Sequence, residues 1–200
     1  MRSAAYALWI GLVSGCGTVT PVPEDVFLRL EVASVPSSTT APWHPGALRI
    51  APFRADGLHQ ERAVIITADG VTLRRHPNYY WLADPPHLLQ QQLQRYLRAA
   101  RIAAKIVTER ELDEALVLRG EIVRFELNTT KPGVLDLELG FSLVEVARER
   151  EVFHQEYRVQ QPLAEVTPAA VAHGMSKAVA KIYADFVTDA ANHKSTLAKE

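Results

Sequence analysis

The thiol best placed to do chemistry is Cys16, the only cysteine in the chain. It closes the stretch Leu12-Val13-Ser14-Gly15-Cys16, which follows the basic residue Arg2 and an apolar run from Ala4 to Val13. This order of a basic residue, about ten apolar residues and then small residues is typical of a secretory signal. The run is too short for a membrane-spanning helix, which takes roughly 20 apolar residues. We therefore expect removal of the signal near Cys16.

The motif Val13-Ser14-Gly15-Cys16 resembles the lipobox of bacterial lipoproteins. The resemblance implies diacylglycerol on the Cys16 thiol, cleavage between Gly15 and Cys16, and acylation of the new amino group. Residues 1–15 are then the signal peptide and residues 16–25 a lipidated tether. Once acylated, the thiol is lost to disulfides, thiolate metal sites and nucleophilic catalysis. The alternatives are an ordinary signal peptide with an incidental cysteine, and a buried N-terminal helix.

Other residue types that often carry catalysis or metal binding show no productive spacing. The seven histidines are His44, His59, His76, His87, His154, His173 and His193. They form neither an His-Glu-x-x-His motif nor another close ligand pair. The sequence also has no Gly-x-Ser-x-Gly nucleophile elbow and no Gly-rich phosphate loop. We therefore expect no enzymatic activity, no metal site, and no cofactor apart from the covalent lipid on Cys16.

One stretch combines basic and aromatic residues, Arg74-Arg75-His76-Pro77-Asn78-Tyr79-Tyr80-Trp81. Three consecutive aromatic side chains cannot all face one core, whereas Tyr, Trp and Arg often supply the strongest contacts of interfaces. Trp81 is expected to be buried next to the following helix. We predict Arg75, Tyr79 and Tyr80 as a candidate partner interface, on the view that the stretch connects two elements. The alternative places one of the two tyrosines in the core.

The composition describes one globular domain with almost no net charge. Hydrophobic residues make up 48% of the chain, and 22 basic residues face 23 acidic ones. A net charge of −1 provides no field that attracts nucleic acid, so no nucleic-acid partner is expected. We expect a single domain over residues 26–191 and a polar tail over residues 192–200.

Hydrophobic periodicity predicts a domain of eight strands and two helices. The expected strands cover residues 26–32, 47–53, 63–67, 71–75, 104–107, 116–127, 134–146 and 152–159. Asp69-Gly70 predicts a two-residue hairpin turn. Asp84-Pro85 and Thr167-Pro168 are typical helix starts, for helices that end near Arg101 and Ala191. The pattern favours the α+β class, with a mixed, largely antiparallel sheet and both helices packed on one face.

The apolar alternation changes phase inside the longest strand. Leu118 and Ile122 have one parity, whereas Val123, Phe125 and Leu127 have the other. Because side chains alternate with a period of two, a β-bulge at Ile122-Val123 reconciles the two sets. If Val123 lies opposite Leu139, the bulge places Gly120 opposite Phe141, whose ring would cover the glycine. Val144 and Val146 break phase in the same way, and burial on both faces near the strand ends is the alternative.

The order of these motifs resembles the ABC-type transport auxiliary lipoproteins, partners of MCE-domain intermembrane lipid transporters. The resemblance rests on the lipobox with its short tether and on the strand Leu48-Arg49-Ile50-Ala51-Pro52-Phe53. It rests also on Tyr79-Tyr80-Trp81-Leu82-Ala83-Asp84-Pro85-Pro86 and on Leu118-Arg119-Gly120-Glu121-Ile122-Val123-Arg124-Phe125. The closing helix completes it, and together these motifs cover nearly the whole mature chain.

This resemblance implies a non-catalytic lipoprotein component of an MCE-type lipid transport system. Its expected partners are an MCE-domain protein and the ABC permease and ATPase, with a homo-oligomer as a further possibility. The residue after Cys16 is Gly17 and not an aspartate. By resemblance to enterobacterial lipoproteins, the absence of an aspartate at this position implies sorting to the outer membrane, with the domain facing the periplasm. The alternative function is a stand-alone envelope lipoprotein, either an outer-membrane assembly factor or a lipid hydrolase.

Overall fold

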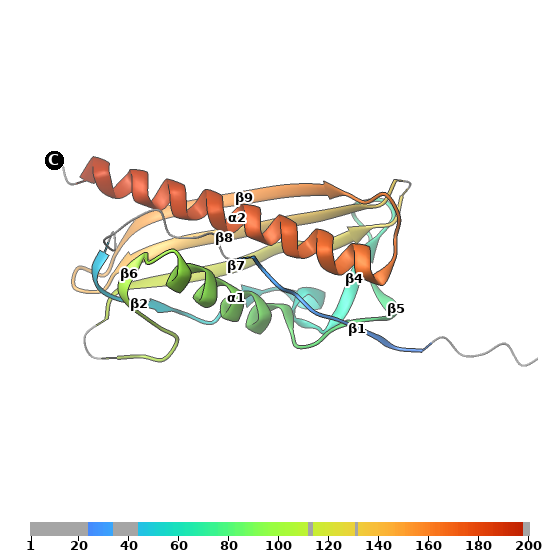
Figure 1. Ribbon diagram of the computed structural model, residues 1–200, viewed down its shortest axis with the longest axis horizontal. Coiled ribbons are helices and arrows are strands. Elements are labelled where there is room, and N and C mark those ends of the chain that lie inside the picture. Colours follow the sequence, from blue (N-terminus) through green and yellow to red (C-terminus); the bar gives the residue numbers. More distant parts are fainter. Residues whose placement is uncertain (1–23, 34–43, 112–113, 131, 198–200) are drawn as a thin grey trace, which may run out of the picture.

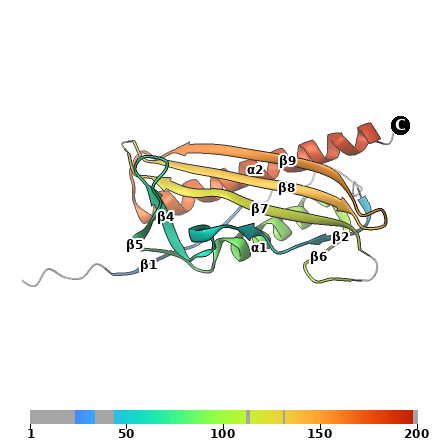
Figure 2. The same ribbon diagram turned by 180° about the vertical axis from the view of Figure 1, so that it is seen from behind.

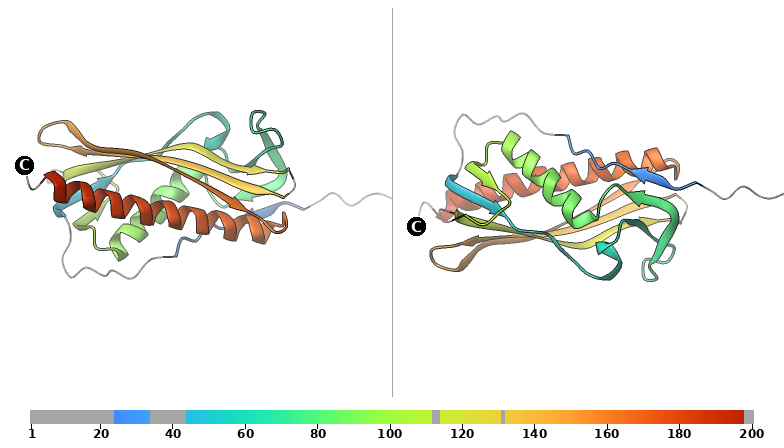
Figure 3. Two further views of the ribbon diagram at one scale, coloured as in Figure 1. Left: turned by 90° about the horizontal axis from the view of Figure 1, so that it is seen from above. Right: turned by 90° about the horizontal axis from the view of Figure 1, so that it is seen from below.

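The computed structural model describes residues 24–33, 44–111, 114–130 and 132–197. These residues form a nine-stranded mixed sheet with two helices, so the predicted α+β class is confirmed (Figure 1). Both helices lie on the same side of the long strands (Figure 3). In chain order the elements are β1 Val26–Leu28, β2 His44–Ile50, β3 Arg54–Ala55, the 3-10 turn η1 Gly57–Gln60, β4 Ala63–Thr67, β5 Arg74–Trp81, α1 Pro85–Ala99, β6 Ala103–Val107, β7 Glu114–Asn128, β8 Val134–Glu145, β9 Arg150–Pro162 and α2 Pro168–Leu197.

Strand β7 organises the sheet. Along one edge it pairs antiparallel with β8, which pairs antiparallel with β9. Along its other edge β2, β3 and β4 follow one another, all parallel to β7. Strand β6 joins β2, while β5 and then β1 extend the sheet beyond β4. The two long ladders are thus antiparallel as expected, and the short strands add parallel pairings that sequence patterns did not predict.

The predicted bulge in β7 is confirmed. Leu139 pairs with Ile122 and not with Val123 as expected, and Arg124 pairs with Glu138, so Val123 is the additional residue. The bulge lets Ile122 and Phe125, each 2% exposed, face the same core. Val123 does not join them as expected, because its side chain is 39% exposed.

The second change of phase has a different origin. Val117 pairs with Val144 without a register shift between β7 and β8. Val117 is buried although it lies outside the core cluster that contains its neighbours Leu116 and Leu118. The outer face at this end is thus buried at Val117 and partly buried at Val144, in line with the alternative interpretation, while the register of β8 against β9 shifts between Leu143 and Val144 through an additional residue on β9.

Gly120 lies opposite Phe141 as predicted, but a different ring covers it. A methyl group at position 120 would come within 2.5 Å of the ring of Phe53. Phe53 itself is buried and meets Phe141 edge to face at 5.9 Å between centroids. The glycine is therefore needed to let Phe53 lie flat on the strand.

Substitution of Gly120 by alanine should destabilise the domain, because the buried Phe53 ring must move. We expect a loss of about 1–3 kcal/mol in the free energy of unfolding, measured by chemical denaturation. The matched control is Gly140→Ala in β8, whose methyl group would lie 3.7 Å from Glu156 and 3.8 Å from Glu121, at ordinary contact distance. That change should be neutral or stabilising by about 0.4–1 kcal/mol. Equal losses in both variants would show that Phe53 does not constrain position 120.

The N-terminal strands differ from expectation in their bounds. Strand β1 ends at Leu28, rather than at residue 32, because the following backbone turns toward the helices. There the amide of Glu31 donates to the Ser176 hydroxyl and the amide of Val32 to the Gln92 side chain, both at 3.1 Å. These helix side chains take the place of a neighbouring strand.

The connection between β4 and β5 is longer than the predicted two-residue turn. It covers residues 68–73, and the return strand begins at Arg74 rather than at residue 71. The Asp69 carboxylate accepts the amides of Val71 at 2.9 Å and Thr72 at 2.6 Å, while Gly70 adopts a φ of +74°. A carboxylate-centred loop thus replaces the backbone-only turn that Asp69-Gly70 favours.

Both helices begin where predicted. The Asp84 carboxylate accepts the His87 amide at 3.0 Å, and the Thr167 hydroxyl accepts the Ala170 amide at 3.3 Å. Helix α2 continues to Leu197, beyond its expected end near Ala191. Despite this length, no helix of the described chain is long and apolar enough to cross a membrane.

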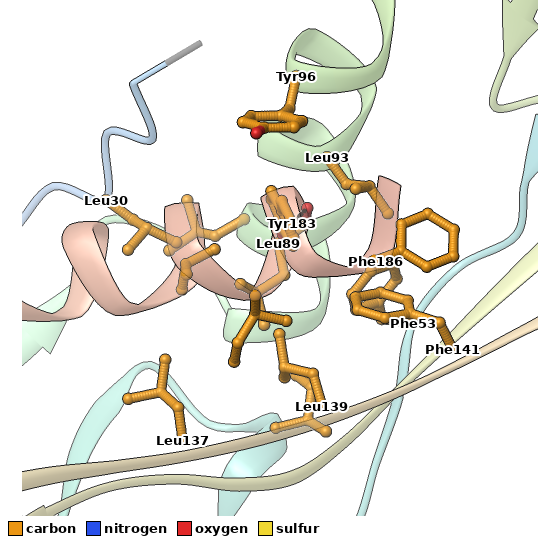
Figure 4. Packing of buried hydrophobic residues seen from close by; sticks show 14 of the residues in the cluster. Leu30, Phe53, Leu89, Leu93, Tyr96, Leu137, Leu139, Phe141, Tyr183 and Phe186 are labelled. Atoms are coloured by element: carbon orange, nitrogen blue, oxygen red, sulfur yellow. Dashed lines mark hydrogen bonds between the residues drawn. The ribbon is translucent and has the colours of Figure 1, made fainter. Parts of the chain in front are cut away.

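The core fills the space between the helices and the inner face of the sheet. The predicted stripe of α2 is confirmed, with at most 1% exposure at Val171, Met175, Ala178, Val179, Ile182, Tyr183 and Phe186. Phe141 of β8 packs against Phe186 at 4.8 Å between centroids (Figure 4). The Tyr183 hydroxyl donates to the Leu89 carbonyl at 2.8 Å, which links α2 to α1.

Candidate functional site

The predicted site residues fall into two groups. Gly15 and Cys16, the cleavage and lipidation positions, lie outside the described residues. Arg75, Tyr79 and Tyr80 all belong to β5, so the stretch is a strand and not the connection that was predicted. Trp81, at the end of β5, is 1% exposed and lies 5.2 Å from the Phe125 ring, which confirms its expected burial.

Strand β5 contains a wide bulge around Pro77. Arg75 pairs with Ile65 and Tyr80 with Ala63, so β5 has more residues between these two pairs than β4 has. Proline has no amide hydrogen for the ladder, which makes a bulge the natural place for it. His76 closes this loop, since its Nδ1 accepts the amides of Asn78 at 3.2 Å and Tyr79 at 3.1 Å.

The three candidate interface residues have separate surroundings. The Tyr79 ring stacks on the His76 ring with 3.7 Å between centroids and packs against the core, which gives Tyr79 a structural role. Arg75 is exposed and donates two hydrogen bonds to Glu61, which hold the pKa of that carboxyl below its usual range. Tyr80 is half-buried, and its hydroxyl donates to the Pro77 carbonyl at 2.9 Å. An interface role for Arg75 and Tyr80 stays a prediction.

Sequence reasoning missed the neighbour of Tyr80. The ring of Phe27 in β1 lies 5.9 Å from that of Tyr80 and is 54% exposed. The Arg62 guanidinium lies 5.6 Å from the Phe27 centroid and donates to the Trp81 carbonyl at 3.1 Å. We call Phe27, Arg62 and Tyr80 the aromatic patch. The available signal was the alternation in β1, which puts Phe27 on the opposite face from Leu28.

A polar cluster, separate from the aromatic patch, covers part of the outer face of the sheet. His59 of η1 meets Glu126 of β7 at 3.2 Å, and both are buried. Arg124 lies 3.8 Å from Glu126 and 3.2 Å from Glu138. The cluster fastens η1 to the sheet. No group of three or more histidine, cysteine or acidic side chains suited to a metal ion occurs within the described ranges.

Residues 29–187 match the model of the family described as the ABC-type transport auxiliary lipoprotein component. This match spans almost all of the described domain, from the end of β1 into α2. The chain belongs to this family. The resemblance inferred from the sequence motifs is therefore confirmed, and with it a place among auxiliary lipoproteins of ABC-type transport.

Solved structures similar to this auxiliary lipoprotein share its fold. Protein XCC0632 from Xanthomonas campestris superposes with a TM-score of 0.77 at 16% identity, over 88% of this chain and 99% of that one. A second crystal structure, of an uncharacterized protein, superposes with a TM-score of 0.68 at 9% identity, over 84% of this chain and 99% of that one. The hypothetical protein CT253 from Chlamydia trachomatis gives 0.53 at 8% identity, over 76% and 99%. The comparison with curated proteins gives no match.

The bulge of this auxiliary lipoprotein should respond to pH through His76. Its Nδ1 accepts hydrogen bonds only when unprotonated, and burial lowers the pKa of the ring. Because the pKa of His76 is lower in the folded state, its hydrogen bonds contribute fully to stability above about pH 6.5, the ordinary pKa of histidine. This contribution is lost as the pH falls from there through the lowered pKa of the folded state. His76→Asn keeps an acceptor but does not titrate. Thermal unfolding over a pH series should therefore show a smaller acid loss in this variant, and identical profiles would contradict the assignment.

Proposed function

We propose that this auxiliary lipoprotein is a non-catalytic, lipid-anchored component of an MCE-type ABC system that moves phospholipid or another lipid between membranes. The observation that carries the proposal is the family match over residues 29–187, which begins shortly after the predicted lipidation position Cys16. The proposed location is the outer membrane, with the domain in the periplasm. The proposed partners are an MCE-domain protein, the permease and the ATPase.

The packing of the domain supports a role as a rigid docking body. The helices and the sheet enclose a continuous core, in which Leu89, Leu137 and Tyr183 have no measurable exposure. Gly174 brings α2 so close to the sheet that a methyl group there would lie 2.7 Å from Leu135 and 2.9 Å from Leu163. Such packing holds the surface residues of the domain in fixed positions, which lowers the entropic cost of binding a partner.

Affinity purification from native membranes tests the proposal. The full chain, tagged at its C-terminus and extracted in mild detergent, should enrich an MCE-domain protein together with its permease and ATPase. An unrelated lipoprotein with the same tag is the control for proteins that co-extract with any lipid anchor. If the chain purifies without transporter components and hydrolyses lipid esters, the stand-alone hydrolase becomes the better account.

A further inference from the structure

Exposed apolar side chains gather at one end of the domain. Within the described ranges, five large apolar residues are exposed, namely Phe27, Val71, Leu82, Val123 and Val166. Four of them belong to β1 or to the connections β4–β5, β5–α1 and β9–α2. Strand β1 and the connections β4–β5 and β9–α2 lie at the end where the described chain begins, opposite the C-terminal end of α2 (Figures 1 and 2). The Leu82 amide binds the Leu28 carbonyl at 3.0 Å, which places it beside β1.

The β4–β5 connection presents its apolar residue in a fixed turn. Val71 is 84% exposed, yet its amide donates to Asp69, and the Thr72 amide and hydroxyl donate to the same carboxylate. The backbone hydrogen bonds of Thr72 and Val71 hold the pKa of Asp69 well below its usual range, so the carboxylate keeps its charge. The hydrogen-bonded turn therefore keeps Val71 exposed in a fixed position at this end of the domain, where other exposed apolar residues gather, and such gatherings mark contact surfaces.

The aromatic patch at the same end has the composition of a membrane interface. Aromatic rings with polar partners concentrate at the headgroup level of bilayers, and arginine covers apolar groups while its charge stays in water. Phe27 and Tyr80 provide the rings, and Arg62 lies over Phe27. A half-exposed phenylalanine under a guanidinium suits this boundary.

The predicted lipid anchor brings a membrane to this end. Cys16 precedes Phe27 by only eleven positions in the sequence. Even a fully extended chain adds at most about 3.6 Å per residue, so Phe27 stays within roughly 40 Å of the acylated residue. The bilayer that holds the acyl chains is therefore within reach of this end of the domain.

We propose that this end of the domain is a lipid-contacting surface, with Phe27, Val71, Leu82 and Val166 at the boundary between headgroups and acyl chains. The surface supplements the acyl chains and sets the orientation of the domain, so that the opposite end points away from the membrane. The inference rests on the proposed anchoring at Cys16, but it does not depend on which transporter the domain serves.

Single labels on the acylated full chain test this surface. Because Cys16 is the only cysteine and acylation consumes its thiol, Phe27→Cys and Val71→Cys each supply one free thiol for an environment-sensitive fluorophore. The labelled proteins are placed in phosphatidylethanolamine and phosphatidylcholine vesicles whose acyl chains carry bromine. We expect the emission of both labels to shift to the blue and to be quenched by bromine. Val123→Cys, an exposed apolar position in the middle of β7, is the matched control and should show neither effect.

The other outcomes overturn the proposal in distinguishable ways. Labels at positions 27 and 71 that behave like the label at 123 show that this end stays in water. If the emission shifts to the blue without bromine quenching, and the shift increases with protein density, the surface contacts a second copy of the chain. If the blue shift occurs only after transporter is added, the surface contacts a partner protein. If the Cys16 thiol of the unmodified chain is free, the chain has no lipid anchor, and no bilayer is held near this end of the domain. The vesicles contain no transporter, so a failed co-purification leaves this result unaffected.

Discussion

A Cys16→Ala variant is expected to lose its membrane anchor and to keep its signal uncut or leave the membrane fraction. Each buried methylene contributes about 0.8 kcal/mol to membrane binding, so a protein with two or more acyl chains stays bound while one without them dissociates. Fractionation after an alkaline wash measures the anchoring, and mass spectrometry of the N-terminus measures the processing.

The matched control for this prediction is Ser14→Ala, which keeps a small residue in the motif and leaves the thiol in place. That variant should be processed and anchored as the unmodified chain is. If Cys16→Ala is processed normally and still fractionates with membranes after the wash, Val13-Ser14-Gly15-Cys16 is not a lipobox.

Phe141→Ala should give the largest loss of stability among single core substitutions in the aromatic cluster. Phe141 is 1% exposed, and its ring lies 4.8 Å from Phe186, 5.9 Å from Phe53 and 6.2 Å from Tyr183. Truncation removes the contacts that join β8 to α2 and leaves a cavity in a closely packed core. Chemical denaturation should show a decrease of about 3–5 kcal/mol in the free energy of unfolding.

The same truncation at an exposed ring provides the control. Phe27 is 54% exposed, so Phe27→Ala gives up little buried surface and should cost less than about 1 kcal/mol. Comparable losses for the two variants would mean that the ring cluster around Phe141 does not hold α2 on the sheet.

The features best predicted from sequence are those with local causes. The helix starts at Asp84 and Thr167 depend on a side-chain cap followed by proline, and both caps form. The bulge at Val123 was predictable because a period of two cannot bury Ile122 and Phe125 on one face without an additional residue.

The features that sequence did not predict have non-local causes. The parallel pairing of β2, β3 and β4 with β7 joins residues far apart in the chain, and no turn motif marks such a pairing. Likewise, the stretch from Arg74 to Trp81 was predicted as a connection and not as a strand, because the His76 side chain, which closes the bulge in β5, carries no sequence signature. The early end of β1 depends on Ser176 and Gln92, which come from the two helices.

The candidate site was predicted only in part for the same reason. Tyr80 was identified through its aromatic neighbours in sequence, whereas Phe27 joins it only because β1 pairs with β5. Tyr79 was assigned to the interface as a member of the same basic and aromatic stretch, and its stacking on His76 shows that the two rings have different surroundings. Adjacent residues on a strand point to opposite faces, so a run of aromatics cannot be treated as one surface.

The central claim, that this auxiliary lipoprotein serves lipid transport between membranes as a tethered component, is tested most directly by following labelled phospholipid in cells. The transfer rate between the two membranes is measured in cells that lack the chain and in cells complemented with the unmodified protein, Cys16→Ala or Gly140→Ala. The account predicts slowed transfer without the chain, restoration by the unmodified protein and by Gly140→Ala, and no restoration by Cys16→Ala. Equal transfer rates with and without the chain would contradict it.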